Sequence, residues 1–395
     1  VSQASFTASH ELVSLMFLSA TGDSLIADPR WYPTRRVETH MLEGLIAGPQ
    51  SHLSDALVNA IPSGTSISAG GIELSDHVAK VSLNGTLPSD DRGKQLMAWE
   101  ISQTLQRSGR VNSVEINVGG EALPSSGLPS QPSFDLDSAV ALNSNGLVRI
   151  DGRSVSTRIL PITPSTSASL PAVSPVSSSL LAWREDDRLV LVDSSTNATR
   201  VVDGSEGQYS PSIDRFGWVW DIPRGGNLRA SRIDGQNLAI ASENQSLNGV
   251  SAVRISPDGA RALLLRQVGG STSAWIAGIE RRGSGEPIAL TDPEPLAGLS
   301  TGVDDVSWAG RSTVVAVRQG GLRAGNDQVD EVSLVTVPVG GFPSVLALPT
   351  GTQRLSAGSS SATMVIRGKD GNYQVRSGAL WQSLEGNLRD VNFPG

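Results

Sequence analysis

The sequence contains no cysteine and only four histidines, and these two shortages exclude several kinds of chemistry. Without cysteine, its 395 residues cannot form a disulfide, an iron–sulfur cluster, a thiolate zinc site or a cysteine nucleophile. The histidines are His10, His40, His52 and His77, so no residue beyond position 77 can supply an imidazole as a base, a metal ligand or a pH-sensitive group.

Lysine is scarce as well, and the basic residues are not clustered. Lys80, Lys94 and Lys369 are the only lysines among 31 basic residues, and 39 acidic residues give a formal net charge of -8. An acidic chain without a basic run lacks the electrostatic footprint of a nucleic-acid binder. It also lacks the polybasic segment that would attract anionic lipid. We therefore expect no nucleic-acid partner.

Long apolar runs are missing too. The longest one near the start, residues 12–20, is interrupted by Ser14 and Ser19 and is much shorter than the roughly 20 residues that cross a bilayer. This run predicts a buried strand. A secretion signal or a lipid anchor would have to lie upstream of Val1.

Composition divides the chain in two. Residues 119–133 are rich in serine, glycine and proline, which is typical of a linker. We expect an α+β domain over residues 1–120, a linker over 121–133 and an all-β propeller over 134–395.

Strand and helix patterns alternate in the first part. We expect strands over residues 11–19, 25–32, 65–74, 77–83 and 111–118. A first helix is expected after Thr34 as N-cap, with apolar residues at helical spacing up to Gly48, and a short helical stretch over 54–59. Ser89 or Asp90 caps a longer helix. The helices are expected to pack on one face of a small sheet.

The second part consists of short apolar strands that repeat with polar turns between them. The first turns of the repeated units lie at Ser178, Asp214, Asp258, Arg311 and Ser361, with spacings of 36, 44, 53 and 50 residues. These spacings bracket the ~40 to 50 residues of a four-stranded propeller blade. With a partial blade over residues 134–160, the pattern predicts about six blades, and strands around Trp381 are expected to complete the ring.

Several segments of the chain match known families in order. The first part resembles the GerMN (sporulation and spore germination) domain, on the stretches VSLMFLSATGDSLIAD (13–28), LEGLIAGP (42–49), AIPSGTSI (60–67) and HVAKVSLN (77–84). The second part, with ISPDGARALLL (255–265), is similar to the lipoprotein propeller that follows this domain in actinobacterial LpqB-type lipoproteins. The resemblance covers essentially the whole chain.

The resemblance implies a location and a partner that the composition does not give. It implies an extracytoplasmic lipoprotein held to the cell membrane through an N-terminal cysteine upstream of this sequence. It also implies association with the extracellular domain of a sensor histidine kinase, MtrB of the MtrAB two-component system, and an influence on cell-envelope homeostasis.

Short motifs that could carry catalysis or metal binding have simpler interpretations. Residues 298–302 read Gly-Leu-Ser-Thr-Gly and match the G-x-S-x-G string of hydrolases, but no histidine follows Ser300 to act as its base. The pairs His40 with Glu43 and His52 with Asp55 favour helix surfaces over metal sites. The acidic groups 185–187 and 304–305 are interpreted as solvated turns. We expect no catalytic residue, metal or cofactor.

Two aromatic clusters are the candidates for partner binding. Phe216, Trp218 and Trp220 alternate and would share one face of a strand, either packed against the next blade or forming a patch for a partner or a glycan. The second cluster is Trp31, Tyr32, Arg35 and Arg36, whose residue types are enriched in interfaces, although the start of a solvated helix accounts for them as well.

The sequence therefore predicts a non-enzymatic envelope lipoprotein that regulates a two-component sensor kinase through protein binding. The alternative is a binding module for cell-wall glycan or peptide that localises envelope enzymes. Hydrolysis by a pair of carboxylates is a third and weaker hypothesis, because no such pair can be located from one sequence.

Overall fold

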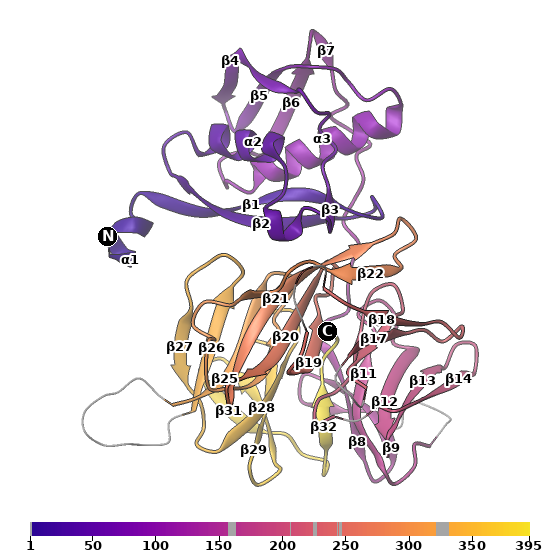
Figure 1. The fold of residues 1–395 in the computed structure, drawn as a ribbon. Helices are drawn as coiled ribbons and strands as arrows, with labels where there is room; N and C mark the ends of the chain where they lie inside the picture. The colour runs from indigo at the N-terminus through magenta and orange to yellow at the C-terminus, as the bar shows by residue number, and fades with distance from the viewer. Residues whose placement is uncertain are drawn as a thin grey trace. The chain divides into compact units, whose positions relative to one another are not determined.

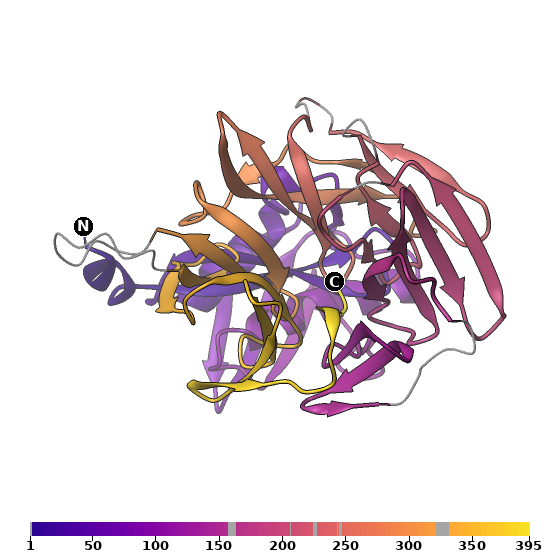
Figure 2. The same cartoon turned by 90° about the horizontal axis from the view of Figure 1, so that it is seen from below.

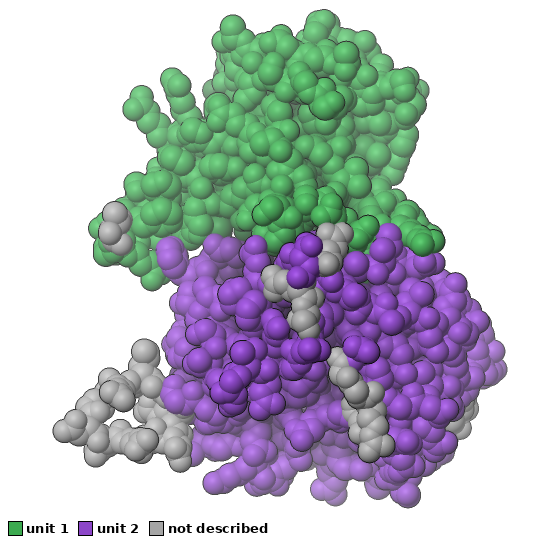
Figure 3. Space-filling model, in the orientation of Figure 1, with its two compact units in different colours: residues 1–132, 280–285 green, residues 133–279, 286–395 purple. Residues whose placement is uncertain are grey.

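The computed structural model describes residues 2–156, 163–205, 207–223, 227–242, 244, 247–320 and 332–395. The chain divides into two compact units (Figure 3). The first comprises Val1–Pro132 with Glu280–Gly285, and the second comprises Ser133–Ile279 with Glu286–Gly395. The division after Pro132 falls near the end of the predicted linker. The end of the partial blade predicted up to Leu160 lies outside the described residues.

The first unit contains two sheets and three helices in its described part (Figure 1). One sheet has the order β2-β1-β3, with β1 (His10–Ser19), β2 (Leu25–Pro33) and β3 (Leu57–Val58). The other has the order β4-β5-β6-β7, with β4 (Ser66–Ser75), β5 (Val78–Asn84), β6 (Ser113–Val118) and β7 (Glu121–Ala122). The helices are α1 (Gln3–Thr7), α2 (Val37–Ala47) and α3 (Asp91–Gln106).

Helices α2 and α3 form a layer between the two sheets, and the prediction of helices on one face of a single small sheet was wrong. Helix α3 contacts β1 on one side and β6 on the other, while α2 contacts β1, β2 and β4 (Figure 1). The cause is visible in α3, where Met97 and Ile101 are buried but so are Trp99 and Glu100 on neighbouring faces. A helix covered on two sides buries more than the single apolar stripe that its sequence shows.

Some predicted boundaries in the first unit also need correction. The N-cap of α2 is Arg36, with φ 55°, and not Thr34. Residues 54–59 do not form a helix, because η1 spans Ser51–Leu53 and the chain then pairs as β3 with the end of β1. Asp90 is the N-cap of α3 and accepts a hydrogen bond from the Gly93 N–H at 2.7 Å, as one of the two predicted caps.

The second unit is a β-propeller with six blades among the described residues (Figure 1). Blade 1 contains β8 (Ser138–Asn143), β9 (Gly146–Asp151), β10 (Ser154–Val155) and β32 (Arg389–Asn392). Blade 2 contains β11 (Ala168–Val173), β12 (Leu180–Glu185), β13 (Arg188–Asp193) and β14 (Ala198–Asp203). Blade 3 contains β15 (Ser212–Ile213), β16 (Val219–Asp221), β17 (Leu228–Ser231) and β18 (Asn237–Ile240).

The remaining blades follow the same order from inner to outer strand. Blade 4 contains β19 (Val250–Ile255), β20 (Arg261–Val268), β21 (Ser271–Arg281) and β22 (Pro287–Leu290), with β23 (Glu294–Pro295) added beside β21. Blade 5 contains β24 (Val303–Trp308), β25 (Thr313–Gln319), β26 (Val332–Pro338) and β27 (Ser344–Ala347). Blade 6 contains β28 (Thr352–Ala357), β29 (Met364–Gly368), β30 (Tyr373–Ser377) and β31 (Leu380–Ser383).

The ring is completed by the last strand of the chain. Strand β32 pairs antiparallel with β8, with Asn392 opposite Val140, and becomes the inner strand of blade 1. Trp381, which was expected in the closing strand, lies instead in β31, the outer strand of blade 6. Closure by pairing removes the open edge that a ring of sheets would otherwise leave.

Apolar side chains fill the space between neighbouring blades. The cluster between blades 4 and 5 includes Leu263 and Leu265 from one blade and Val306 and Trp308 from the other. Because each blade buries both of its faces in this way, most apolar residues point toward a neighbouring blade. Polar residues of the inner strands remain to line the axis. Within the described residues, no helix combines the length and apolar character needed to span a membrane.

Candidate functional site

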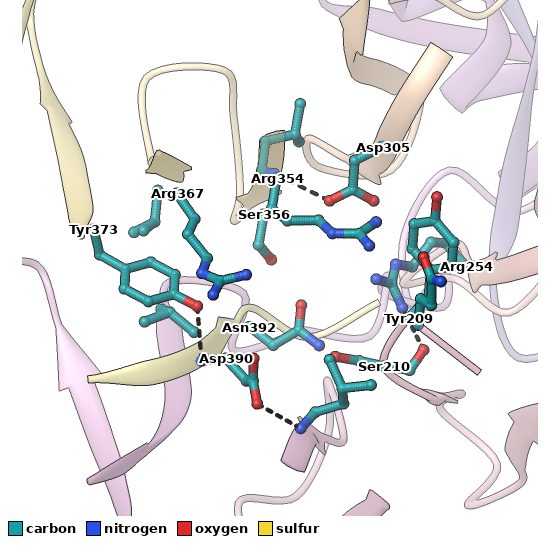
Figure 4. A pocket seen from close by; sticks show the side chains of 15 residues that line it. Tyr209, Ser210, Arg254, Asp305, Arg354, Ser356, Arg367, Tyr373, Asp390 and Asn392 are labelled. Carbon is teal, nitrogen blue, oxygen red and sulfur yellow. Dashed lines mark hydrogen bonds between the residues drawn. The ribbon is translucent and has the colours of Figure 1, made fainter. Parts of the chain in front are cut away.

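The axis of the propeller contains a polar cavity of about 100 Å³ (Figure 4). Its lining comes from the inner strands β11, β19, β24, β28 and β32, from the segment before β15 and from two further strands of blade 6. The polar side chains at its wall include Tyr209, Arg254, Asp305, Arg354, Ser356, Arg367, Tyr373, Asp390 and Asn392. Three arginines and two aspartates thus meet in one small space.

The alternation of side chains along the inner strands explains why charged residues reach the axis. In β28, Leu355 and Ala357 belong to the apolar cluster shared with blade 5, so Arg354 and Ser356 lie on the opposite face. In β19, Val253 and Ile255 pack toward blade 3, which places Arg254 on the other side of the strand.

In three of the six blades, the next-to-last residue of the inner strand is a serine that links two blades. It occupies this position in β15, β24 and β28, and its hydroxyl oxygen accepts an N–H from the inner strand of the next blade or from the residue that follows that strand. These bonds run from Ile255 to Ser212 (2.9 Å), from Ala357 to Ser307 (3.0 Å) and from Phe393 to Ser356 (2.8 Å). They satisfy backbone donors at the inner edges of the blades. In β19 the same position is Arg254.

The three arginines differ in how much of their hydrogen-bonding capacity is used. Arg254 is 6% exposed and its Nη1 donates to the carbonyl oxygen of Ser210 at 2.6 Å. The guanidinium of Arg354 lies 4.2 Å from the centre of the Tyr209 ring, in a cation–π arrangement. Arg367 is half-buried. Among the residues that the structure describes, none of these three groups has a carboxylate oxygen within 4.0 Å.

The two aspartates are held by backbone donors. Asp305 accepts N–H groups from Val306 and Leu355, each at 3.0 Å. Burial raises the pKa of the Asp305 carboxyl, an effect that the nearby Arg254 and Arg354 oppose. Burial also lowers the pKa of the Arg254 guanidinium, and Asp305 opposes this effect in turn. Asp390 accepts the N–H of Leu170 at 3.0 Å, which joins blades 1 and 2.

Tyr209 lies across the mouth of the cavity. Its hydroxyl donates to the Asp304 carbonyl oxygen in blade 5 at 2.8 Å, and its own carbonyl oxygen accepts from Arg184 Nε in blade 2 at 3.1 Å. Burial raises the pKa of the Tyr209 hydroxyl, so it remains a hydrogen-bond donor at neutral pH. The hydroxyl bond thus holds the ring to blade 5, and the carbonyl bond holds the Tyr209 backbone to blade 2.

A second cavity of about 380 Å³ lies outside this mouth. It shares Tyr209, Arg354 and Arg367 with the inner cavity and adds Asp304 and Gln353 to the wall. Because Asp304 and Gln353 stand near the starts of β24 and β28, the outer cavity opens on the face of the propeller where the inner strands begin.

The other end of the axis is filled by the last residues of the chain. Phe393 is 5% exposed and donates its N–H to Ser356 of blade 6. A Cβ at Gly395 would lie 3.5 Å from the Ile255 carbonyl oxygen of blade 4 and 4.0 Å from Trp308 of blade 5. Residues 393–395 therefore cross from blade 1 toward blades 4 and 5, and Figure 2 shows the C-terminus inside the ring of blades.

The axial cavity corrects one expectation directly. Asp304 and Asp305 do not form a solvated turn, because both belong to the inner strand β24 and Asp305 is 3% exposed. The signal in the sequence was an acidic pair inside a stretch of strand-forming residues that alternates Val306 and Trp308 with the polar Ser307. The acidic group 185–187, in contrast, does lie at the turn between β12 and β13, and Asp186 there has φ 56°.

The first predicted aromatic cluster is mostly internal. Trp218 and Trp220 are 1% and 0% exposed and belong to the apolar cluster between blades 3 and 4, as the packing interpretation expected. Trp220 Nε1 donates to Asp214 Oδ2 at 2.9 Å. Of the three aromatic residues, only Trp220 lies in β16 (Val219–Asp221), and Trp218 immediately precedes this strand. Phe216 stands in the turn before it, where its ring lies 4.6 Å from the Arg215 guanidinium.

The second predicted cluster does not form one surface. Trp31 and Tyr32 are neighbours in β2 and therefore point to opposite faces of the strand. Trp31 contacts the Phe6 ring at 5.0 Å, whereas the Tyr32 hydroxyl lies against α2, where a Cβ at Gly44 would come within 2.0 Å of it. Arg35 and Arg36, the other two members of the predicted cluster, are exposed just before α2.

The remaining motifs supply no reactive constellation in the described part of the chain. Ser300 is exposed in the turn that precedes β24. His40 Nδ1 and Glu43 Oε2 are 3.3 Å apart on the surface of α2. Among the described residues, no group of three or more His, Asp or Glu is arranged to hold a metal ion.

Comparison with known proteins identifies families for both parts. Residues 140–394 match the family described as the lipoprotein LpqB beta-propeller domain, and residues 14–124 match the family described as sporulation and spore germination (Germane). The chain is 30% identical over 196 residues to Lipoprotein LpqB of Streptomyces avermitilis, which covers 47% of this chain and 31% of that protein. It is 25% identical over 358 residues to Lipoprotein LpqB of Mycolicibacterium smegmatis, which covers 79% of this chain and 59% of that protein.

Among solved structures, TolB from Acinetobacter baumannii is similar with a TM-score of 0.47 and 14% identity, covering 100% of this chain and 86% of that chain. The chain spans less than two thirds of the length of the two curated relatives. The propeller match, however, extends from β8 to β32 and takes in every blade described above. The chain therefore belongs to the family of the lipoprotein LpqB β-propeller domain, with a sporulation and spore germination domain before the propeller.

Proposed function

We propose that this chain is the extracytoplasmic part of a non-enzymatic lipoprotein that binds the extracellular domain of a two-component sensor kinase of the MtrB type and thereby influences cell-envelope homeostasis. The observation that carries the proposal is membership of the LpqB propeller family over residues 140–394. Curated relatives from several actinobacteria are named lipoproteins, which supports attachment at the outer face of the cell membrane.

The structure offers a place to begin mapping such contacts. Arg35 and Arg36 are exposed where β2 leads into α2, and Arg36 adopts φ 55°. Arginine is enriched in protein interfaces because its guanidinium makes several hydrogen bonds at once. Trp218 and Trp220, being internal, are poor choices for mutation, since their loss would act through the core.

Binding can be measured directly with the 395-residue chain and the extracellular domain of the sensor kinase from the same organism. We expect saturable binding by biolayer interferometry in the micromolar range or tighter. Reversing charge in the double variant R35E/R36E should slow association by roughly tenfold, because exposed interface charges act mainly on the association rate. The matched control is R188E, at an exposed arginine in blade 2.

Two outcomes would count against the proposal. Absence of binding up to about 100 μM, a weak affinity of only ~5.5 kcal/mol, would remove the kinase as a direct partner. Equal binding to the extracellular domain of an unrelated kinase would show that the contact is not specific. Circular dichroism of each variant checks that its fold is intact.

A further inference from the structure

We propose that the axial cavity of the propeller binds a carboxylate group, carried by a small molecule or by the end of a peptide, through Arg254, Arg354 and Arg367. This inference concerns a ligand site inside the propeller and does not depend on the kinase partnership. It rests on the charge, the construction and the size of the cavity.

The first argument is the excess of guanidinium groups over carboxylates in the inner cavity. The guanidinium groups of Arg254, Arg354 and Arg367 converge on the same space from blades 4 and 6 (Figure 4). A buried cation is costly unless an anion or several hydrogen bonds compensate it. Arg254 is 94% buried yet has one hydrogen bond from its side chain to a protein acceptor among the described residues, to Ser210. Its remaining donors can serve a ligand.

The second argument is that the fold does not require an arginine at position 254. In three other blades the equivalent residue is serine, namely Ser212, Ser307 and Ser356, and its hydroxyl links one blade to the next. A propeller blade can therefore be built with a small side chain here. The large cation in blade 4 replaces that link and points its charge at the axis instead.

The third argument concerns which anion fits. Within the inner cavity, three guanidinium groups face the two carboxylates of Asp305 and Asp390, which leaves one net formal positive charge there. The carboxylate of Asp304 lies in the wall of the outer cavity. This balance suits a monoanion better than a phosphate dianion. A carboxylate also matches the planar fork of an arginine, which donates two parallel N–H groups to its two oxygens.

The fourth argument is size and access. The inner cavity of about 100 Å³ has room for several water molecules, and therefore for a carboxylate and the carbon that bears it. The outer cavity of about 380 Å³ can hold the rest of a small ligand. Because residues 393–395 fill the opposite end of the axis, the ligand enters past Tyr209.

One further donor completes the proposed site. The hydroxyl oxygen of Tyr373 accepts the backbone N–H of Asp390 at 2.7 Å, so the hydroxyl hydrogen is left to donate toward a ligand oxygen. Burial raises the pKa of this hydroxyl, which keeps it protonated at neutral pH. A carboxylate bound on the axis would thus meet arginines on two sides and a neutral donor from blade 6.

The test uses the 395-residue chain and calorimetric titration with four probes: acetate, inorganic phosphate, and trialanine with either a free or an amidated C-terminus. We expect saturable binding of free trialanine, weaker binding of acetate and at least a tenfold preference for the free over the amidated peptide. R367Q should weaken binding of free trialanine at least tenfold, or about 1.4 kcal/mol. R188Q, at an exposed arginine away from the cavity, should leave it unchanged.

A second variant separates binding from folding. R254S gives blade 4 the serine that blades 3, 5 and 6 already have, so it should fold and lose at least tenfold in trialanine affinity. Equal affinity for the acid and the amide, or wild-type affinity in both R254S and R367Q, would overturn the site. Tighter binding of phosphate than of acetate and free trialanine would overturn the choice of ligand. If neither acetate nor trialanine binds saturably at concentrations up to about 20 mM, which is 20 times a dissociation constant of roughly 1 mM, the proposal as a whole is overturned.

Discussion

Glu100 is a buried carboxylic acid in the middle of α3, and its environment favours the protonated form. The residue is 0% exposed, and its Oε2 accepts the N–H of Ala60 at 2.7 Å. Its Oε1 has no hydrogen-bond partner within the described residues. Burial raises the pKa of this carboxyl to about 8, although the bond from Ala60 opposes the change.

This raised pKa predicts that the first unit is less stable in alkaline solution. In the unfolded chain the Glu100 pKa returns to about 4.5, so the folded state binds the proton more tightly. The resulting stabilisation is complete below pH 4.5 and is lost as the pH rises through 8. Because each pKa unit corresponds to about 1.4 kcal/mol, the loss amounts to a few kcal/mol.

The variant E100Q isolates this effect, since its side chain stays neutral at every pH. Urea unfolding at pH 5 and at pH 8.5, monitored by tryptophan fluorescence, gives the free energy of unfolding for the transition of the first unit. We expect E100Q to lose most of the difference between the two pH values, whereas E115Q, at an exposed position of β6, should keep it. An unchanged difference in E100Q would mean that another group titrates.

A buried polar network around Asp28 joins strand β2 to the end of helix α2 in the first unit. Asp28 in β2 is 0% exposed, forms a 2.7 Å ion pair with Arg30 and accepts hydrogen bonds from the backbone and side-chain nitrogens of Gln50 at 3.0 and 2.7 Å. Arg30 in turn donates to the carbonyl oxygen of Gly48 at 2.7 Å, the residue that ends α2. Strand β2 and the end of α2 are thereby held in one position.

Removing the Asp28 carboxylate from this polar network should lower the free energy of unfolding. D28A leaves the Arg30 guanidinium and the two donors of Gln50 without their partner in a buried place, and we expect a loss of about 3 to 5 kcal/mol in the free energy of unfolding. The control D55A, at an exposed residue after η1, should change it by less than about 0.5 kcal/mol. Urea unfolding of both variants measures the change. A loss of less than about 1 kcal/mol in the free energy of unfolding of D28A would contradict the role assigned to the polar network.

Strands and long helices were predictable from the sequence wherever a pattern was local. The Asp90 cap, the apolar spacing of α3 and the repeated turn residues all act within a few positions, so their consequences can be read from one stretch of chain. The burial of Glu100 and Asp305 could not be predicted in this way. Each depends on a second element, β1 or β28, that covers the residue from a distant part of the chain.

The axial cavity likewise could not be predicted from any single stretch of the sequence. Arg254 looks like an ordinary surface arginine in a strand, and its meaning appears only when β19 is set beside the inner strands of the other blades. The comparison of repeated units in the sequence already aligned their turns. Extending that alignment inward by four residues sets Arg254 against Ser307, but Ser356 lies five residues before its turn and comes into line only after a shift of one residue.

At the scale of the whole propeller, closure depends on a short strand at the end of the chain. Strand β32 and the residue after it place Val391 and Phe393 in the apolar cluster of blades 1 and 6, together with Ala141 and Val148. It also connects three blades by hydrogen bonds, from Asn392 Nδ2 to Pro171 at 3.0 Å and from the Phe393 N–H to Ser356 at 2.8 Å. We therefore expect the ring to unfold as a unit, since opening one blade frees the edges of its neighbours.

This closure predicts that F393A destabilises the whole propeller and not only blade 1. Truncating a phenylalanine that is 5% exposed should cost about 3 to 5 kcal/mol and lower the thermal midpoint of the entire propeller transition. L380A is the matched control, because Leu380 is 67% exposed on the outer strand β31 and should change stability by less than about 0.5 kcal/mol. Scanning calorimetry distinguishes unfolding of the whole propeller from unfolding of blade 1 alone. One cooperative propeller transition at lower temperature is expected, whereas a new early transition for blade 1 alone, with the remainder at its original midpoint, would show that the ring does not depend on its closing strand.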